Sequence, residues 1–476
     1  MKLVYNVHDR PKRKQLFIFA IQQLLAIISA TVAVPAAING MFEGGVGLSA
    51  SSALYGAGIG TIVYLLFTGF KSPVFLGSSF AFINSMCVAF SSATVGGVLN
   101  KPLGNLGLVL GAFFAGMVYV VIAVVVKHVG TNWIGKIMPA AVIGPVVSIV
   151  GLLLSENAIS DMQTSKGGNR FAAFTCALVT LLTIVVVSVY GKKFIKLIPF
   201  VIGIGAGYLC ALIFTVIAYV TNTPSLQIID FSPITRLFEG GVHLETFFAH
   251  PKFVFERAVV GLKDVTWEYV GAIAAAFIPV AFVVFAEHLA DHKNLSTIIE
   301  KDLLKDPGLD KTLLGDGVGS MVGALVGGCE NTTYGESIGC VAITRNASIR
   351  TIALTAAMAV GMSFISPLMA LLETIPACVM GGVCVALYGF IAVSGLKITQ
   401  KVDLEQSKNL FTISVILVAG IGKLSLHIGG IKITEIACAL ILGIIVNAIC
   451  NIPKKEKMKV KIIEELKYID KEKKYN

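Results

Sequence analysis

Stretches of about twenty apolar residues recur along almost the whole chain, which is the length that a helix needs to cross a bilayer. Two further segments, 73–90 and 329–345, are apolar but are interrupted by Gly-Ser-Ser and Asn-Thr-Thr. The continuous stretches are 15–38, 47–69, 106–127, 134–154, 171–190, 195–221, 268–290, 312–328, 349–369, 375–395, 408–424 and 431–450. Together with the two interrupted segments, they predict a polytopic membrane protein with about fourteen transmembrane segments.

The composition excludes most water-soluble classes. Hydrophobic residues make up 55% of the chain and charged residues only 14%, against about 25% charged residues in soluble domains. The mean hydropathy is +0.83. A soluble enzyme, a nucleic-acid-binding protein and a disordered protein are therefore excluded, and the partner that we expect is the lipid bilayer. The nine cysteines lack metal-site or disulfide spacing, so we expect no metal and no cofactor.

Most of the positive charge lies at the two ends of the chain. The net charge is +10, yet residues 1–14 hold five cations against one acid, and residues 451–476 hold nine lysines against five acids. Basic segments beside spans remain in the cytoplasm, so we expect both tails to be cytoplasmic. An even number of segments satisfies that requirement, and the protein is predicted to lie in the cytoplasmic membrane.

The two halves of the chain resemble each other. Residues 139–146 match 376–383 at five of eight positions, and Ser78-Ser79 matches Thr332-Thr333 at an offset of about 254 residues. Two seven-span repeats follow, 15–221 and 268–450, joined by an extracellular loop, 222–267. Because seven is odd, the second repeat enters from the opposite side. Inverted repeats are typical of secondary transporters.

The predicted fold class is therefore an all-α polytopic membrane protein with short extended stretches in segments 3 and 10. Non-helical backbone at membrane depth must be buried in protein or must line a cavity. We expect Ser78 and Ser79 to cap one short helix, and Asn331, Thr332 and Thr333 to cap the other. The helix N-termini would then point at a central site.

Several ionisable residues lie in or near apolar segments. Glu287 follows about eighteen largely apolar residues, and Glu336 lies in the second interrupted segment. A carboxylate at membrane depth costs about 2.5–3.5 kcal/mol, so we interpret both as functional groups, one of which gains and loses a proton during transport. His288 is either a proton partner or a packing histidine. We expect Glu330 to be a solvated carboxylate at the outer mouth.

Several strings, taken in order, resemble the nucleobase–cation symporter-2 (nucleobase–ascorbate transporter) family, and most of all its uracil permeases. They are Gly77–Phe82, Ala286–His288, Lys301–Gly308, Asn331–Glu336 with Ile338-Gly339, Val379–Gly382 and Leu387–Gly389. The resemblance implies a core domain of spans 1–4 and 8–11 that moves against a gate domain of spans 5–7 and 12–14. It also implies a homodimer and a substrate held between the two interrupted segments.

The resemblance further assigns roles to individual residues. Glu287 and Glu336 would hydrogen-bond a pyrimidine, and Phe80 would pack on its ring. The other pocket residues that it implies are Ala30, Tyr334 and Gly335, with Tyr388 contributed by the gate domain. The proton-coupling candidates are Glu287, His288, Asp291 and Glu336. The family's uracil permeases carry a histidine where this chain has Asp291.

These observations predict a uracil:proton symporter that works by alternating access and performs no enzymatic reaction. Uracil offers ring N–H donors between C=O acceptors, which suits carboxylates and helix N-terminal amides. The alternatives are a purine permease for xanthine, urate or guanine and, less favoured, an anion transporter with the same inverted repeats. The residues leave Na⁺ open as the coupling ion in place of H⁺.

Overall fold

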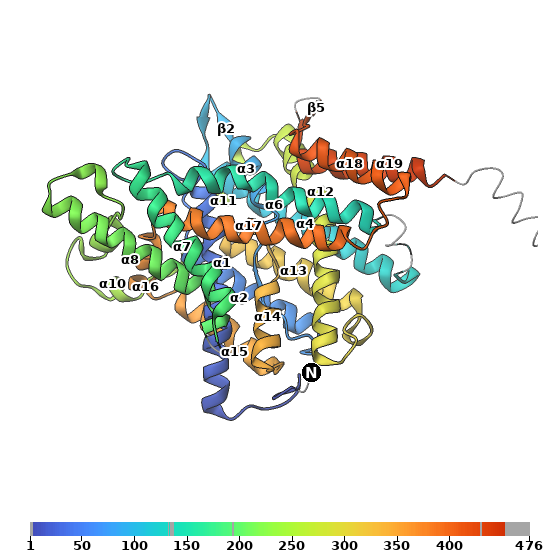
Figure 1. Cartoon of the computed structure of the whole chain (residues 1–476), viewed down its shortest axis with the longest axis horizontal. Coiled ribbons are helices and arrows are strands. Elements are labelled where there is room, and N and C mark those ends of the chain that lie inside the picture. The colour runs from blue at the N-terminus through green and yellow to red at the C-terminus, as the bar shows by residue number, and fades with distance from the viewer. Residues whose placement is uncertain (1–2, 132, 134–137, 193–194, 429–430, 453–476) are drawn as a thin grey trace, which may run out of the picture.

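The computed structural model describes residues 3–131, 133, 138–192, 195–428 and 431–452, and the chain in these ranges is mainly helical (Figure 1). The predicted C-terminal tail, 451–476, therefore falls almost wholly outside the described residues. Three two-stranded sheets accompany the helices. Extended backbone was predicted for one of these sheets, whereas the hairpins β2–β3 and β5–β6 were not predicted.

The first half of the chain contributes ten α-helices and strands among the described residues. They are α1 (Arg13–Gly40), α2 (Ala50–Phe67), β1 (Leu76–Ser78), α3 (Ile83–Ser91), β2 (Thr94–Val95), β3 (Val98–Leu99), α4 (Lys101–Val129), α6 (Ala140–Met162), α7 (Arg170–Tyr190) and, completing the half, α8 (Pro199–Val220). The predicted loop 222–267 contains three short helices, α9 (Ser232–Thr235), α10 (Leu244–Phe247) and α11 (Val254–Gly261). Helix α11 packs against α4, so part of this loop belongs to the folded body.

The second half follows the same plan. Its elements are α12 (Trp267–Ile299), α13 (Leu309–Gly327), β4 (Asn331–Thr333), α14 (Gly335–Thr344), α15 (Ile349–Met362), α16 (Ser366–Glu373), α17 (Ala377–Thr399), α18 (Ser407–Ile421), β5 (Leu426–Ile428), β6 (Ile431–Ile433) and α19 (Glu435–Cys450). The predicted segment 349–369 is split into α15 and α16, because Pro367 lies in the first turn of a new helix. The predicted segment 268–290 is longer than expected and continues to Ile299.

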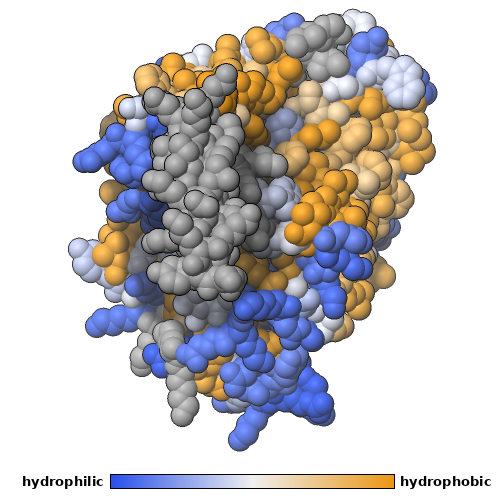
Figure 2. All heavy atoms as spheres, turned by 90° about the vertical axis from the view of Figure 1, so that its right-hand side faces the viewer, coloured by the Kyte–Doolittle hydropathy of each residue, from blue (hydrophilic) through white to orange (hydrophobic). Residues whose placement is uncertain are grey.

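The helices have the length and surface of a membrane protein. Within the described residues, eight helices are long and apolar enough to cross a bilayer, namely α1, α2, α4, α6, α7, α8, α12 and α17. Helices α7 and α8 expose large apolar side chains, such as Phe171, Leu182, Leu209 and Ile213. Figure 2 shows hydrophobic side chains over much of one face and hydrophilic ones gathered at its lower end. The chain is a multi-pass membrane protein.

Helix contacts in one half have counterparts in the other. Helix α1 packs against α15, as α12 packs against α4, and α2 packs against α15, as α13 packs against α4. The pairs α7–α8 and α18–α19 correspond in the same way, and they lie on opposite sides of the molecule (Figure 1). Contacts between corresponding elements, α2–α13, α6–α17 and β1–β4, join the two halves.

The helices α2 and α13 cross closely because glycines face each other. A Cβ atom on Gly56 would lie 2.4 Å from the carbonyl oxygen of Gly323, and one on Gly60 would lie 2.7 Å from that of Gly319. Small residues allow such close approach of helices in membranes. The crossing supports β1 and β4, since the side-chain Nδ2 of Asn331 donates to the Gly56 carbonyl over 3.1 Å.

Strands β1 and β4 pair antiparallel at the centre of the molecule, with Leu76 opposite Thr333, Gly77 opposite Thr332 and Ser78 opposite Asn331. The predicted extended stretches are thus confirmed. The predicted helix caps are wrong, because α3 and α14 begin later, after Phe82 and Tyr334, and neither has a side-chain cap. The strand pairing uses the polar residues that were expected to cap the helices.

Candidate functional site

A cavity of about 390 Å³ lies where the two interrupted segments meet α12 and α17, a size typical of small-molecule sites. Residues of both interrupted segments line it, and α17 closes it with Leu387, Phe390, Ile391, Ser394 and Ile398. The strand pair fixes the position of both segments, because the Ser79 amide donates to the Glu330 carbonyl over 2.7 Å and the Tyr334 amide donates to the Phe75 carbonyl over 3.1 Å. The cavity wall is therefore built on paired backbone.

Three carboxyl groups line this cavity. Glu287 and Asp291 come from α12, and Glu336 comes from the first turn of α14. Positions i and i+4 share a helix face, so α12 presents Glu287 and Asp291 together. The Thr333 hydroxyl donates to Asp291 Oδ2 over 3.0 Å. No lysine, arginine or histidine is among the described residues that line the cavity, which suits a ligand that donates hydrogen bonds.

Aromatic rings form another part of the wall. Phe80, Phe200, Tyr334 and Phe390 line the cavity. The Tyr334 hydroxyl donates to the Ser78 carbonyl over 2.8 Å and so joins the two interrupted segments. A flat ligand can stack on such rings while its edge meets the carboxyl groups.

The structure brings together most of the predicted substrate residues. Glu287, Glu336, Phe80, Tyr334 and Gly335 line the cavity.

Two other predicted residues lie outside the cavity wall. Tyr388 packs edge-on against the ring of Phe80, with ring centroids 6.0 Å apart. Ala30, on α1, is buried, and neither residue lines the cavity. Tyr388 is placed to hold Phe80 rather than to touch a ligand directly.

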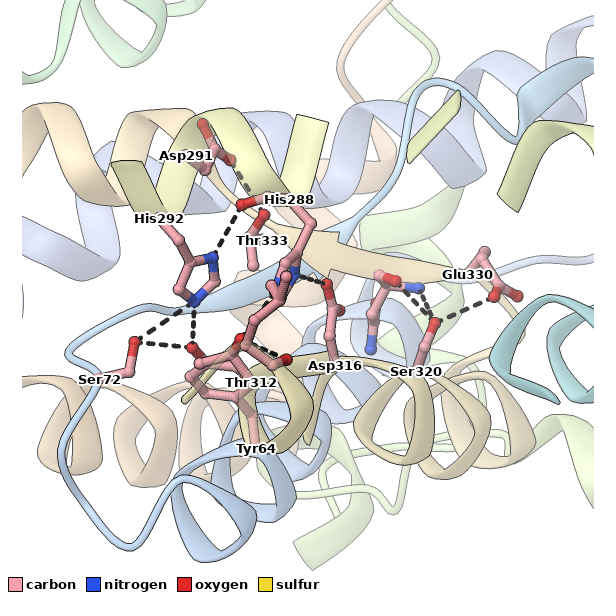
Figure 3. A network of polar contacts seen from close by, with 12 residues as sticks. Tyr64, Ser72, His288, Asp291, His292, Thr312, Asp316, Ser320, Glu330 and Thr333 are labelled. Carbon is pink, nitrogen blue, oxygen red and sulfur yellow. Dashed lines mark hydrogen bonds and ion pairs between the residues drawn. The ribbon is translucent and has the colours of Figure 1, made fainter. Parts of the chain in front are cut away.

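Another face of α12 carries two histidines that do not line the cavity and that join a buried polar network (Figure 3). His288 Nδ1 lies 2.6 Å from Asp316 Oδ2, and His288 Nε2 lies 3.1 Å from the Thr312 hydroxyl. His292 Nδ1 donates to the His288 carbonyl over 2.9 Å. The histidine expected as either a proton partner or a packing residue is thus fully buried and bonded to an acid.

This buried network includes residues that the sequence analysis did not single out. Tyr64 of α2 lies 2.7 Å from His292 Nε2, and its hydroxyl lies 2.7 Å from the Ser72 hydroxyl. Asp316 lies within the apolar segment 312–328. An acid inside a predicted span is itself a signal of function, so Asp316 could have been found. No comparable signal marks Tyr64 or Ser72.

The expectation that Glu330 is a solvated carboxylate is wrong. Its exposed fraction is 3%, and the Ser320 hydroxyl donates to Oε1 over 3.1 Å. The physical reason is the strand pairing, because the hydrogen bond from the Ser79 amide to the Glu330 carbonyl draws this residue into the interior. The sequence shows that Glu330 precedes the interruption but cannot show that the interruption pairs with another strand.

The described residues contain no group of three or more His, Cys, Asp or Glu side chains arranged to hold a metal ion.

Residues 14–429 match the family described as "Permease family". The chain belongs to this family, the nucleobase–cation symporter-2 permeases. The protein is therefore a membrane transporter and not an enzyme. The family predicted from the motifs is confirmed.

Curated relatives cover nearly the whole chain. The uracil permease of Bacillus subtilis (strain 168) is 36% identical over 465 residues, which cover 96% of this chain and 97% of the relative. The uracil permease of Escherichia coli (strain K12) is 32% identical and covers 92% of both chains.

A solved structure supports the fold. The transmembrane domain of a cyanobacterium bicarbonate transporter, BicA, superposes with a TM-score of 0.60 at 15% identity. The match covers 94% of this chain and 98% of that domain. The fold is thus that of a known class of membrane transporter, although the sequences differ widely.

Proposed function

We propose that the protein carries uracil across the cytoplasmic membrane together with a proton, by alternating access. The observation that carries this proposal is the cavity at the β1–β4 crossing, lined by three carboxyl groups and several aromatic rings, in a chain that belongs to this permease family. The uracil permeases of two bacteria, similar over more than 90% of their length, support the choice of substrate.

The chemistry of the cavity fits a pyrimidine. Glu287 and Glu336 accept hydrogen bonds from ring N–H groups, while amides at the start of α14, beside Gly335, meet a carbonyl oxygen. Phe80 and Tyr334 pack on the ring faces. Tyr388 acts from behind Phe80, and Ala30 supports the wall from α1.

The architecture that we propose has fourteen membrane segments in two inverted repeats, 15–221 and 268–450. The matched packing of the two halves supports it, and so does the antiparallel pairing of β1 with β4. The core domain comprises α1–α4 and α12–α16, and the gate domain comprises α6–α8 and α17–α19.

We further propose that both termini are cytoplasmic, that loop 222–267 is extracellular and that two copies associate through their gate domains. The basic residues before α1 support the orientation. The apolar surfaces of α7 and α8 are available for lipid or for a second copy.

The acids near the cavity support the proposed coupling to protons. The groups proposed to exchange the proton are Glu287, His288, Asp291 and Glu336. Uracil is neutral, so its accumulation requires a coupled ion, and Na⁺ is the alternative. Protonation and substrate binding would together favour one conformation of the core against the gate.

Two other substrates are less well supported. A purine permease would share the fold, and competition between uracil and xanthine for uptake shows which of the two is the substrate. An anion transporter is suggested by the similarity to a bicarbonate transporter. However, the carboxyl groups of the cavity would repel an anion, and no cation among the described residues lines the cavity to offset them.

The test is uptake of labelled uracil into proteoliposomes with and without an inward proton gradient. We expect gradient-driven accumulation that excess uracil suppresses and xanthine does not, and that Glu336→Gln abolishes. Accumulation driven by a Na⁺ gradient alone would reassign the ion. Uptake of xanthine in place of uracil, by protein shown to be folded, would contradict the proposed substrate.

A further inference from the structure

A second group of buried acids lies behind the substrate cavity, among α4, α12 and α13. Glu330 Oε1 accepts a hydrogen bond from Ser320, but Oε2 has no hydrogen-bond partner among the described residues. The buried hydroxyls of Tyr119, on α4, and Thr332, on β4, interact with each other but make no hydrogen bond to any other described residue. A buried polar atom without a partner costs about 1–3 kcal/mol, so Glu330 Oε2 indicates that something binds there.

A small cavity lies between these groups. Its volume is about 10 Å³, and its wall includes Tyr119, Asp316, Ser320 and Glu330. That volume is at the lower limit for a single water molecule. One water can therefore join Glu330 Oε2, the Tyr119 hydroxyl and Asp316.

His288 extends the group on the side of α12 (Figure 3). Its Nδ1 is 2.6 Å from Asp316 Oδ2, so one hydrogen joins the imidazole to the carboxyl group. Its Nε2 is 3.1 Å from the Thr312 hydroxyl, and that hydroxyl is also 3.1 Å from the Leu309 carbonyl.

Rotation of the Thr312 hydroxyl suits either protonation state of His288. When the hydroxyl donates to Nε2, the imidazole is neutral. When it donates to the Leu309 carbonyl, its oxygen can accept a hydrogen from a positively charged imidazole. The group can thus hold one proton more or one fewer without moving the backbone.

No lysine or arginine among the described residues pairs with Glu330 to compensate its charge. The titratable side chains around the group are Tyr64 of α2, Tyr119 of α4, Glu287, His288, Asp291 and His292 of α12, Asp316 of α13, and Cys329 next to Glu330. On α11, which packs on α4 and α13, Glu256 is exposed and Arg257 donates to the Gly47 carbonyl. Glu330 forms no ion pair with any described residue. An unpaired buried carboxylate is unfavourable, and a bound proton removes that cost.

We propose that Glu330, Asp316 and His288, with Tyr119 and one water, form a proton-binding site that is separate from the substrate cavity and takes up the coupled proton in place of the cavity acids Glu287, Asp291 and Glu336. Loading forms one O–H bond at Glu330 Oε2 with a proton from external water. The release of that proton to water on the inner side restores the carboxylate. The assignment of the proton as the coupled one rests on the proposed proton symport.

Infrared spectroscopy of the purified protein as a function of pH tests the site without any substrate. We expect the wild type to show a protonated-carboxyl C=O band whose intensity changes with pH. Glu330→Gln should remove the part of that change that comes from Glu330, and Glu239→Gln, which alters an exposed glutamate, should keep the whole change. A pH-dependent band that is identical in Glu330→Gln, or the absence of any such band in the wild type, overturns the proposal.

Transport in proteoliposomes tests the coupling. Glu330→Gln should retain exchange of uracil across the membrane, while its gradient-driven accumulation ratio falls to about one, because a substrate without its coupled ion can only equilibrate. Wild-type accumulation by this variant overturns the coupling role. If the wild type itself exchanges no uracil, the proposed function fails, and the infrared result still decides the proton site.

Tyr119→Phe is a milder variant that keeps the ring contact with His288, whose centroid lies 6.0 Å away. It removes the hydroxyl that, through the water, stabilises the carboxylate. A lost hydrogen bond to a charged group corresponds to about one pH unit, so the infrared titration should move upward by about that amount. An unchanged titration contradicts the assigned geometry, even if Glu330→Gln does not fold.

Discussion

The two interrupted segments have the same backbone plan and very different chemistry. Each consists of a three-residue strand followed by a short helix, β1–α3 in the first half and β4–α14 in the second. From 72 to 91 the first segment carries no charged residue, whereas the second carries Glu330 and Glu336. The first segment supplies Phe80 to the cavity, and the second supplies Glu336.

The two repeats therefore share the backbone arrangement of these segments, whereas only the second repeat supplies acidic groups from them. Each strand supplies hydrogen-bond partners for the backbone N–H and C=O groups of the other, so both are needed for the crossing. Each acid at membrane depth costs about 2.5–3.5 kcal/mol. Because only one half carries acids in these segments, the free-energy cost of burying acids is limited. The first segment, without charges, can pack closely against its neighbours.

The largest effect that we expect is structural and falls on the first segment. A Cβ atom at Gly77 would lie 2.3 Å from the Tyr334 ring. Gly77→Ala should therefore push Tyr334 out of place, break its bond to the Ser78 carbonyl and destabilise the protein by about 1–3 kcal/mol. Thermal unfolding in detergent measures the change, and uracil uptake should be lost with it.

Gly339→Ala is the matched control in the second segment, since nothing lies within 4 Å of a Cβ atom there. This variant should unfold at the wild-type temperature or slightly above it, because alanine favours helix. Equal destabilisation by both substitutions would show that the contact with Tyr334 is not what fixes the first segment.

The sequence predicted where the backbone is extended better than it predicted which segments pair with each other. The interruptions at Ser78-Ser79 and Asn331–Thr333 correctly indicated extended backbone, because Gly, Ser, Thr and Asn break apolar helices. The same residue types also favour helix caps, and that interpretation was wrong. Pairing between residues about 250 positions apart leaves no local signal.

The sequence also predicted part of the site. Residues four apart share a helix face, so the sequence itself indicates that Glu287 and Asp291 lie on one face of α12 and that His288 and His292 lie on another, and the structure has them so. Glu330 was misplaced because its burial depends on the strand pairing.

The second prediction compares the two segments through ligand selectivity. Phe80→Ala should weaken the binding of all nucleobases by about tenfold, because stacking contributes about 1–3 kcal/mol per base and depends little on which base is present. Glu336→Gln should instead weaken uracil and thymine more than xanthine, since it replaces one acceptor oxygen of the carboxylate with an amide NH2 donor. Binding to the purified protein, measured for uracil, thymine and xanthine, tests both variants. A change of selectivity in Phe80→Ala would refute this division of roles.

The smallest expected effect concerns the connection that leads into the first segment. Lys71, just before that segment, lies 2.6 Å from Asp306 Oδ1, and this hydrogen bond lowers the pKa of Asp306. A carboxyl whose pKa is lower in the folded state adds stability above its unfolded pKa, and the gain is lost as the pH falls through the folded value. Lys71→Gln should therefore lower the unfolding temperature slightly at neutral pH and not at all in strong acid.

Because both side chains are partly exposed, high salt should reduce the difference at neutral pH. A difference that persists in strong acid would mean that Lys71 holds the first segment through a contact other than Asp306.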